Sequence, residues 1–184
     1  QGAQLTAEAY RGRVDPNDPA TPPPELTVSA TDATYNEFTL FGVLGGRDYD
    51  TDNIRVLSND QVVLEDDFDD GAIWEWKSFR SGVIGLEVDG AGGFVLRKSG
   101  FDDPNGGTVG LAPPLLDVKL ATLKADTTGG VQNRYSITDA AGNGYGVVLI
   151  YPAGTLRIER RDEWAATTLA NGNETLPGAM ALDT

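Results

Sequence analysis

The stretch that decides the fold is Asp50-Thr51-Asp52-Asn53-Ile54-Arg55-Val56, followed closely by Val63-Leu64-Glu65-Asp66-Asp67-Phe68. The first segment is typical of the closing strand of a β-sandwich, and the second is typical of an opening strand. They occur in the reverse of the order expected for one ordinary domain. This order predicts a chain cut from a repeating architecture, a chain that shares strands with a neighbour, or a permuted sandwich.

Strand-like segments continue on both sides of this pair. Near the beginning of the chain, Leu5, Ala7 and Ala9 alternate with polar or aromatic residues, which indicates a strand. Turn signals such as Asp69-Asp70-Gly71 and Gly142-Asn143-Gly144 separate the later segments, a pattern typical of a sandwich or barrel. We expect strands over residues 5–13, 26–30, 38–44, 54–57, 62–65, 73–79, 83–88, 94–98, 115–123, 134–138, 145–151, 155–160 and 166–170.

One segment also fits a helix. Residues 114–126 begin with a proline, and Leu116, Leu120 and Leu123 fall at helical spacing. The same segment alternates Leu116, Val118 and Leu120, which fits a strand. We favour the strand because every neighbouring segment is strand-like.

Composition excludes several classes of chemistry. The chain of 184 residues contains no cysteine and no histidine, so it has no disulfide, no thiolate metal site and no Ser-His-Asp triad of its own. Its net charge of −14 disfavours binding to nucleic acids and to anionic lipid headgroups. No apolar run approaches the roughly 20 residues needed for membrane insertion as a helix.

Three motifs carry a resemblance to a known superfamily. The first is Leu64-Glu65-Asp66-Asp67-Phe68 with a tryptophan shortly after it. The others are Asn143-Gly144-Tyr145-Gly146-Val147-Val148-Leu149 and Gly154-Thr155-Leu156-Arg157-Ile158-Glu159-Arg160. In this order they resemble the laminin-G-like and concanavalin-like jelly-roll domains. The resemblance implies an all-β fold, an antiparallel β-sandwich with jelly-roll topology.

The same resemblance divides the chain into two parts. Residues 61–184 are similar to the opening two-thirds of such a sandwich, and residues 1–60 are similar to its closing strands. The closing strands then belong to the same sandwich, to a preceding repeat or to a neighbouring subunit. An ordinary domain whose first 60 residues only look like an ending is the further alternative.

An acidic cluster suggests a metal site. Asp48, Asp50 and Asp52 are spaced at i, i+2 and i+4, as in a calcium loop, although the glycine and distal glutamate of an EF-hand are missing. The resemblance implies a structural calcium ion between the opening and closing strands, held by Asp52, Glu65 and Asp67, with Asp48 and Asp50 as additional ligands. The simpler interpretation is a solvated acidic loop.

The three tryptophans are the candidate ligand-binding residues. Trp74 and Trp76 share one face if residues 73–79 form a strand, and there they can stack on sugar rings or pack in the core. Trp164 follows Arg160-Arg161-Asp162-Glu163 in a polar hairpin tip, so we expect it to be the most exposed aromatic side chain.

No catalytic motif is present. Glucanases of this superfamily use a Glu-x-Asp-x-x-Glu strand, and residues 159–163 have the wrong spacing for it. The polysaccharide lyases of the superfamily use a histidine, which this chain lacks. The sequence also contains no phosphate-binding loop and no dinucleotide fingerprint.

These observations lead to ordered expectations about function. The first is a non-catalytic, lectin-like module, extracellular, at the cell surface or on a virion, that binds a glycan or a protein partner, with calcium as its structural ion. The second is a self-associating structural subunit or repeat of a fibre, virion appendage or surface filament assembled by strand sharing. A glycoside-cleaving enzyme is a distant third.

Overall fold

A computed structural model describes residues 3–10, 20–44, 49–80, 83–88, 92–99, 106–118, 121–129, 132–150 and 154–173, with the backbone alone at residues 121–124, 126–129 and 173. Within these residues the chain forms β-strands joined by turns and contains no α-helix. All strand pairs are antiparallel.

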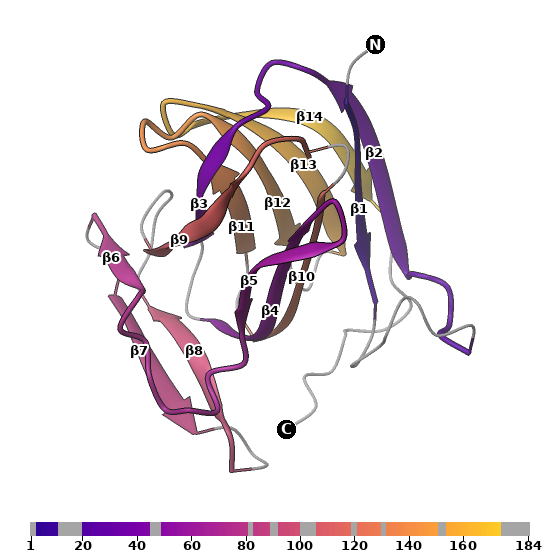
Figure 1. Ribbon diagram of the computed structural model, residues 1–184. Coiled ribbons are helices and arrows are strands. Elements are labelled where there is room, and N and C mark those ends of the chain that lie inside the picture. The colour runs from indigo at the N-terminus through magenta and orange to yellow at the C-terminus, as the bar shows by residue number, and fades with distance from the viewer. Residues whose placement is uncertain are drawn as a thin grey trace.

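The strands form three sheets (Figure 1). The largest sheet contains, in spatial order, β14 (Ala165–Asn173), β13 (Thr155–Asp162), β12 (Gly144–Ile150), β11 (Gln132–Thr138), β3 (Phe38–Leu44), β9 (Gly106–Leu115) and β6 (Lys77–Phe79). The second sheet contains β10 (Ala121–Gly129), β4 (Tyr49–Ser58), β8 (Phe94–Ser99) and β7 (Val83–Val88), with β5 (Gln61–Asp66) also paired to β4. The third is the hairpin of β1 (Ala3–Ala9) and β2 (Leu26–Asp32).

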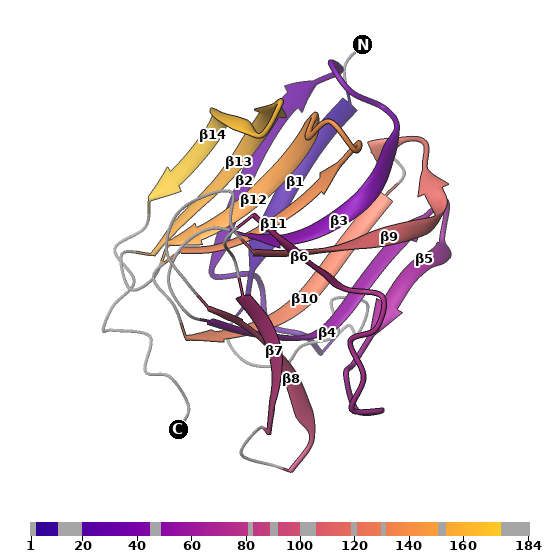
Figure 2. The same cartoon turned by 90° about the vertical axis from the view of Figure 1, so that its left-hand side faces the viewer.

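The two smaller sheets together cover one face of the seven-stranded sheet, which makes an antiparallel β-sandwich (Figures 1 and 2). The hydroxyl of Tyr49 on β4 lies 3.1 Å from the carbonyl oxygen of Arg134 on β11. The Tyr135 hydroxyl, also on β11, donates to Thr51 Oγ1 on β4 at 3.1 Å. Phe41 on β3 packs edge-on against Trp76 and stacks on Tyr135 in the core between the layers. The predicted all-β antiparallel sandwich is confirmed.

The two segments that open the sequence argument pair with each other. Strand β4 runs antiparallel to β5, with Arg55 opposite Glu65 and Ile54 opposite Asp66. The first third of the chain contributes strands to both layers, because β3 lies between β11 and β9, and β4 lies between β10 and β8. These early strands therefore complete sheets whose other members come later in the chain.

The strand expected over residues 73–79 is wrong for its first half. Only residues 77–79 are a strand, and the Trp76 amide donates to the Ile73 carbonyl at 3.1 Å, which closes a turn. The turn is favoured because the Trp76 indole is fixed to Asp66. Trp74 and Trp76 consequently do not share one face of a strand.

The strand expected over residues 115–123 is confirmed only at its two ends. Strand β9 continues to Leu115 and β10 begins at Ala121, and no α-helix occurs in the residues that are described between residues 114 and 126. The strand is interrupted rather than continuous, since residues 116–118 leave the sheet.

A polar cluster fastens the β1–β2 hairpin to the large sheet. Asp32, at the end of β2, accepts hydrogen bonds from the Tyr145 hydroxyl and from the Thr34 amide, both at 2.7 Å. Its second oxygen pairs with Arg160 at 3.3 Å. Burial acts to raise the pKa of Asp32, but the bonds from Thr34, Tyr145 and Arg160 outweigh it and lower the pKa to about 2.

Replacing this carboxylate should destabilise the protein in a pH-dependent way. Because the folded-state pKa is lower than the ordinary value of 3.8, the ionised group stabilises the fold above that value, and the effect disappears as pH falls towards about 2. We expect Asp32→Asn to lower the free energy of unfolding by about 1–2 kcal/mol at neutral pH, with solvent screening included.

Urea unfolding at a series of pH values measures this difference. The control is Asp60→Asn at the exposed β4–β5 turn, which should leave stability within about 0.5 kcal/mol of the wild type. A stability loss in Asp32→Asn that is the same at all pH values would contradict the stabilising role of the ionised Asp32 carboxylate.

Candidate functional site

The last residue of β5 and the connection to β6, residues 66–76, are named here the acidic loop. Its aspartates share one structural role, which is to accept backbone N–H groups and so hold the loop in a fixed conformation. The bonds are Asp66 to Phe68 at 2.9 Å, Asp67 to Asp69 at 3.2 Å, Asp70 to Ala72 at 2.8 Å and Asp69 to Phe94 at 3.4 Å. The loop is therefore an ordered scaffold.

Trp76 anchors this loop in the core. Its side chain is 6% exposed and its ring centroid lies 5.9 Å from that of the fully buried Phe68. The indole Nε1 donates to Asp66 at 2.8 Å. Burial raises the pKa of Asp66, while the hydrogen bonds from Trp76 and Phe68 act in the opposite direction. Trp76, one of the three candidate ligand-binding residues, is thus placed where it supports the loop from below.

Trp74 lies two residues away and points into solvent. Its side chain is 89% exposed, more than any other large apolar side chain in the described residues. Asp67, Asp69 and Asp70 of the same loop are also exposed. The loop therefore presents one large aromatic surface together with several carboxylates, because Trp76 turns inward and leaves Trp74 on the outer side of the turn.

Trp164 is less exposed than its position in a hairpin tip predicts. It lies at the turn between β13 and β14, where its amide donates to the Gly142 carbonyl at 3.0 Å. Its ring is only 4.3 Å from the ring of Phe79 on β6. The expectation that Trp164 is the most exposed aromatic is wrong, because Phe79 and Gly142 lie against its indole. Trp74 holds that position instead.

Two of the predicted metal ligands on β4 are engaged with neighbouring groups. Asp50 accepts both Nε and Nη2 of Arg97 on β8 in a bidentate pair. Asp52, which is 9% exposed, accepts the amide of Asn53 at 2.8 Å and its side-chain nitrogen at 3.1 Å. Asn53 itself has a φ of 48°. Both carboxylates thus fix local backbone or an adjacent strand.

The remaining predicted ligands lie apart from this pair. Glu65 forms an exposed ion pair with Arg55 at 3.3 Å, and Asp67 closes its turn in the acidic loop. Asp48 lies outside the described residues. Within the part of the chain that is described, no group of three or more acidic side chains is arranged to hold a metal ion. The calcium site stays a prediction from the resemblance.

Sequence reasoning missed a buried charge cluster on the other face of the large sheet. Arg134 on β11 and Arg161 on β13 each contact Glu159, at 3.2 and 3.1 Å, and all three are at least 94% buried. Gly146 lies across from Glu159, and a Cβ at Gly146 would lie 3.7 Å from Arg161 Nε. Glycine within a strand was the available signal, since it marks a close approach of neighbouring groups.

Sequence reasoning also missed the second half of the polar cluster around Asp32. The Tyr35 hydroxyl donates to Asp162 at 2.6 Å, and Arg160 Nε pairs with Asp162 at 3.1 Å. Tyr35 and Arg160 lower the pKa of Asp162, so both carboxyl groups of the cluster are ionised at neutral pH. A glycosidase pair needs one protonated carboxyl group as general acid, and this cluster does not provide one. The hydrogen bonds and ion pairs of this cluster suit a structural role, which is to hold the β1–β2 hairpin against the large sheet.

Comparisons with known proteins add no family to this picture. No protein-family model matches the chain, and no curated protein or solved structure matches it either. Among the described residues, no helix has the length and apolar character needed to cross a bilayer. The function must therefore be argued from the surface itself, and the acidic loop with Trp74 is its most distinctive feature.

The two tryptophans of the acidic loop should respond differently to the same substitution. Trp76→Phe keeps an aromatic ring in the core but leaves the partly buried Asp66 without its indole donor, so we expect a loss of about 1–2 kcal/mol in the free energy of unfolding. Trp74→Phe, at an exposed position, should change stability by less than about 0.5 kcal/mol. Urea unfolding compares the two variants, and equal losses would contradict the assigned roles.

Proposed function

We propose that this protein is a non-catalytic β-sandwich module that binds a glycan through Trp74, in an extracellular, cell-surface or virion setting. The observation that carries the proposal is the 89% exposure of Trp74 on a loop that is otherwise fixed by hydrogen bonds. An exposed large aromatic residue on a rigid support marks an interaction site, because its desolvation on binding is favourable and costs little conformational entropy.

The chemistry around Trp74 favours a sugar. A pyranose ring has an apolar C–H face that can stack on an indole, and a rim of hydroxyl groups that donate hydrogen bonds. Exposed Asp67, Asp69 and Asp70 supply carboxylate acceptors in the same loop. The net charge of −14 disfavours sulfated or sialylated chains, so the proposed ligand is a neutral glycan. A protein partner is the alternative ligand for the same surface.

A neutral glycan array tests this proposal with the purified full chain. We expect Trp74→Ala to weaken binding about tenfold or more, since stacking residues at the centre of a contact contribute more than about 1.4 kcal/mol. Leu116→Ala, at an apolar position that is 64% exposed, is the matched control and should bind as the wild type does. Binding that is unchanged in Trp74→Ala contradicts the proposal.

The same assay addresses the predicted calcium ion. Binding and thermal stability are measured with added calcium and with a chelator. A structural ion between β4 and β5 would raise the melting temperature in calcium, because it binds the folded state alone. A melting temperature that is identical in both conditions contradicts the calcium prediction and leaves glycan binding untouched.

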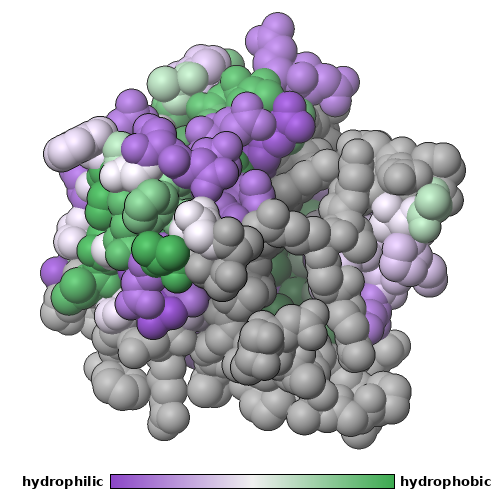
Figure 3. Space-filling model, turned by 90° about the horizontal axis from the view of Figure 1, so that it is seen from below, coloured by the Kyte–Doolittle hydropathy of each residue, from purple (hydrophilic) through white to green (hydrophobic). Residues whose placement is uncertain are grey.

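A second candidate function is a structural subunit that associates by strand pairing. Strand β7 is an edge strand on an arm that projects from the sandwich (Figures 1 and 2). Val83 and Val88 on this strand are 61% and 66% exposed. Apolar side chains are visible among the polar ones over this side of the molecule (Figure 3). Exposed apolar edge strands favour pairing with another chain.

Sedimentation velocity tests this second candidate. A chain that shares strands should sediment as multiples of 19.5 kDa, with a proportion of larger species that rises with concentration. A single 19.5 kDa species at all concentrations contradicts strand sharing.

A further inference from the structure

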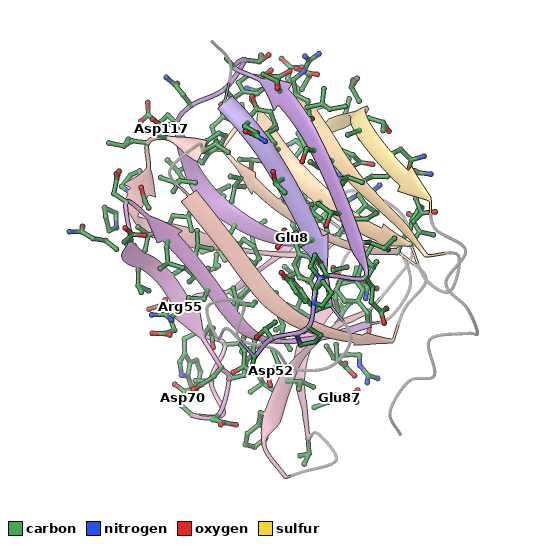
Figure 4. All side chains as sticks on the ribbon, turned by 90° about the vertical axis from the view of Figure 1, so that its right-hand side faces the viewer. Glu8, Asp52, Arg55, Asp70, Glu87 and Asp117 are labelled. Atoms are coloured by element: carbon green, nitrogen blue, oxygen red, sulfur yellow. The ribbon has the colours of Figure 1, made fainter. Side chains whose placement is uncertain are left out.

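Strand β7 has one edge that no described strand occupies. It ends the second sheet, and β8 is its hydrogen-bonded neighbour there. The two strands form an arm that projects from the sandwich (Figures 1 and 4). A Cβ added at Gly85, in the middle of β7, would have no heavy atom within 4 Å. The strand also lacks lysine and proline, with which sheet edges commonly resist pairing. Within the described part of the chain, this edge is therefore open to another strand.

One face of β7 is apolar along its whole length. Ile84, Leu86 and Val88 alternate along the strand, so their side chains share this face. The face turns toward the large sheet, since a Cβ at Gly107 on β9 would lie 2.7 Å from Ile84 Cγ2. Burial decreases along the strand, because Ile84 and Leu86 are partly buried and Val88 is 66% exposed. The apolar face thus continues beyond the sandwich along the projecting arm.

The opposite face of β7 carries the charges of the arm. Glu87, which is labelled at the lower end of the molecule in Figure 4, pairs with Arg97 on β8 at 3.2 Å. Arg97 also binds Asp50 on β4. Gly85 lies directly opposite Arg97 and shares this face with Glu87. Because glycine has no side chain, none separates Arg97 from the outer edge of β7 at this position.

A second copy of β7 fits this edge in few symmetric ways. A closed pair of identical antiparallel strands has a two-fold axis perpendicular to the sheet, so the apolar face of one strand continues the apolar face of the other. An axis at Glu87 would place two carboxylates directly opposite each other, which is destabilising. An axis at Gly85 would place Glu87 opposite the apolar Val83. Axes nearer the ends of β7 pair fewer of its residues. The axis at Leu86 avoids all three faults.

We propose that β7 pairs with β7 of a second copy of this chain about a two-fold axis at Leu86. This inference rests on the strand-pairing function given above as the second candidate. In this register Leu86 faces Leu86 of the second copy, and Ile84 faces the second copy's Val88, so the apolar faces match. Glu87 lies opposite the second copy's Gly85. The second sheets of the two copies then form one continuous antiparallel sheet across the axis.

The charges of the two arms complement each other in this register, which favours a second copy over an unrelated strand. Glu87 faces the second copy's Gly85, and the next residue in that row is the second copy's Arg97. The Cβ atoms of Glu87 and that arginine are two strand spacings apart, roughly 10 Å, a distance that the two long side chains can span. By symmetry the contact occurs twice. Each Glu87 is then flanked by the arginines of both copies, and no carboxylate on β7 faces another carboxylate.

Single cysteines test the register, because the chain contains no cysteine of its own. Only the residue on the axis lies next to its own counterpart, so Leu86→Cys should form disulfide-linked pairs of chains under mild oxidation. In the proposed pair, residues 83 and 88 lie about 20 Å and about 14 Å from their counterparts, which is too far for a disulfide. Val83→Cys and Val88→Cys should therefore cross-link at least tenfold more slowly. Random collisions would give the reverse order, since Val83 and Val88 are more exposed than Leu86.

Sedimentation velocity of the full chain measures the strength of the pair. Val88→Lys places a charge opposite the second copy's Ile84, so we expect it to raise the dissociation constant of the pair tenfold or more. Leu116→Lys adds the same charge at a position that is 64% exposed and lies outside the arm, and it should associate as the wild type does. Both substitutions are at exposed positions, so thermal unfolding should show that both variants fold normally.

The outcomes separate this inference from the second candidate function. If the chains associate but Val88→Lys associates as strongly as the wild type, strand pairing occurs at another edge and the inference fails. If Leu86→Cys cross-links no faster than Val83→Cys, or if Glu87→Cys cross-links in its place, the register is wrong and the inference fails as well. Association beyond two chains contradicts the closed pair. A 19.5 kDa monomer at every concentration overturns both the inference and the second candidate function.

Discussion

The structure depends on one constraint, which is that the apolar face of the seven-stranded sheet must be covered. This face carries Phe41, Tyr135 and Ile158, all nearly or fully buried, and each such side chain contributes about 1.5–3 kcal/mol when it is removed from water. The cover consists of two pieces that share no backbone hydrogen bonds in the described residues. In the described residues, side-chain contacts hold the β1–β2 hairpin against the large sheet, and this explains the polar cluster around Asp32 at its end.

The acidic loop shows how the same packing positions a candidate binding residue. The loop leaves β5 with its aspartates bound to its own backbone, so little conformational freedom remains. The buried Trp76 fixes the inner side of the turn, and the turn then directs Trp74 outward. Trp76 stabilises the fold and Trp74 forms an exposed apolar surface, although the two are separated by a single residue. An exposed aromatic residue on a flexible loop would lose more entropy on binding.

The sequence was sufficient for the fold class because alternating apolar residues and turn signals are local features. The segments around Ile54 and Leu64, which the sequence singled out, pair with each other as β4 and β5. The sequence did not predict the turn at residues 73–76, since the hydrogen bond from Trp76 to Asp66 depends on how the loop folds back. The environment of Trp164 was missed for a similar reason. Phe79 lies 85 residues earlier in the chain, and no local pattern reports that contact. Buried pairs such as Glu159 with Arg134 likewise require the register of neighbouring strands.

Charge and packing together limit how copies of this chain can associate. Each copy carries a net charge of −14, so two copies repel one another at distances up to about a Debye length, roughly 8 Å at physiological salt. Attraction must then come from contacts at shorter range, where backbone pairing and apolar burial act. Edge strand β7 offers both of these, because it is the last strand of its sheet and its Val83 and Val88 side chains are exposed. The acidic loop instead adds exposed carboxylates to this negative surface, which is why a neutral, hydroxyl-rich ligand suits Trp74.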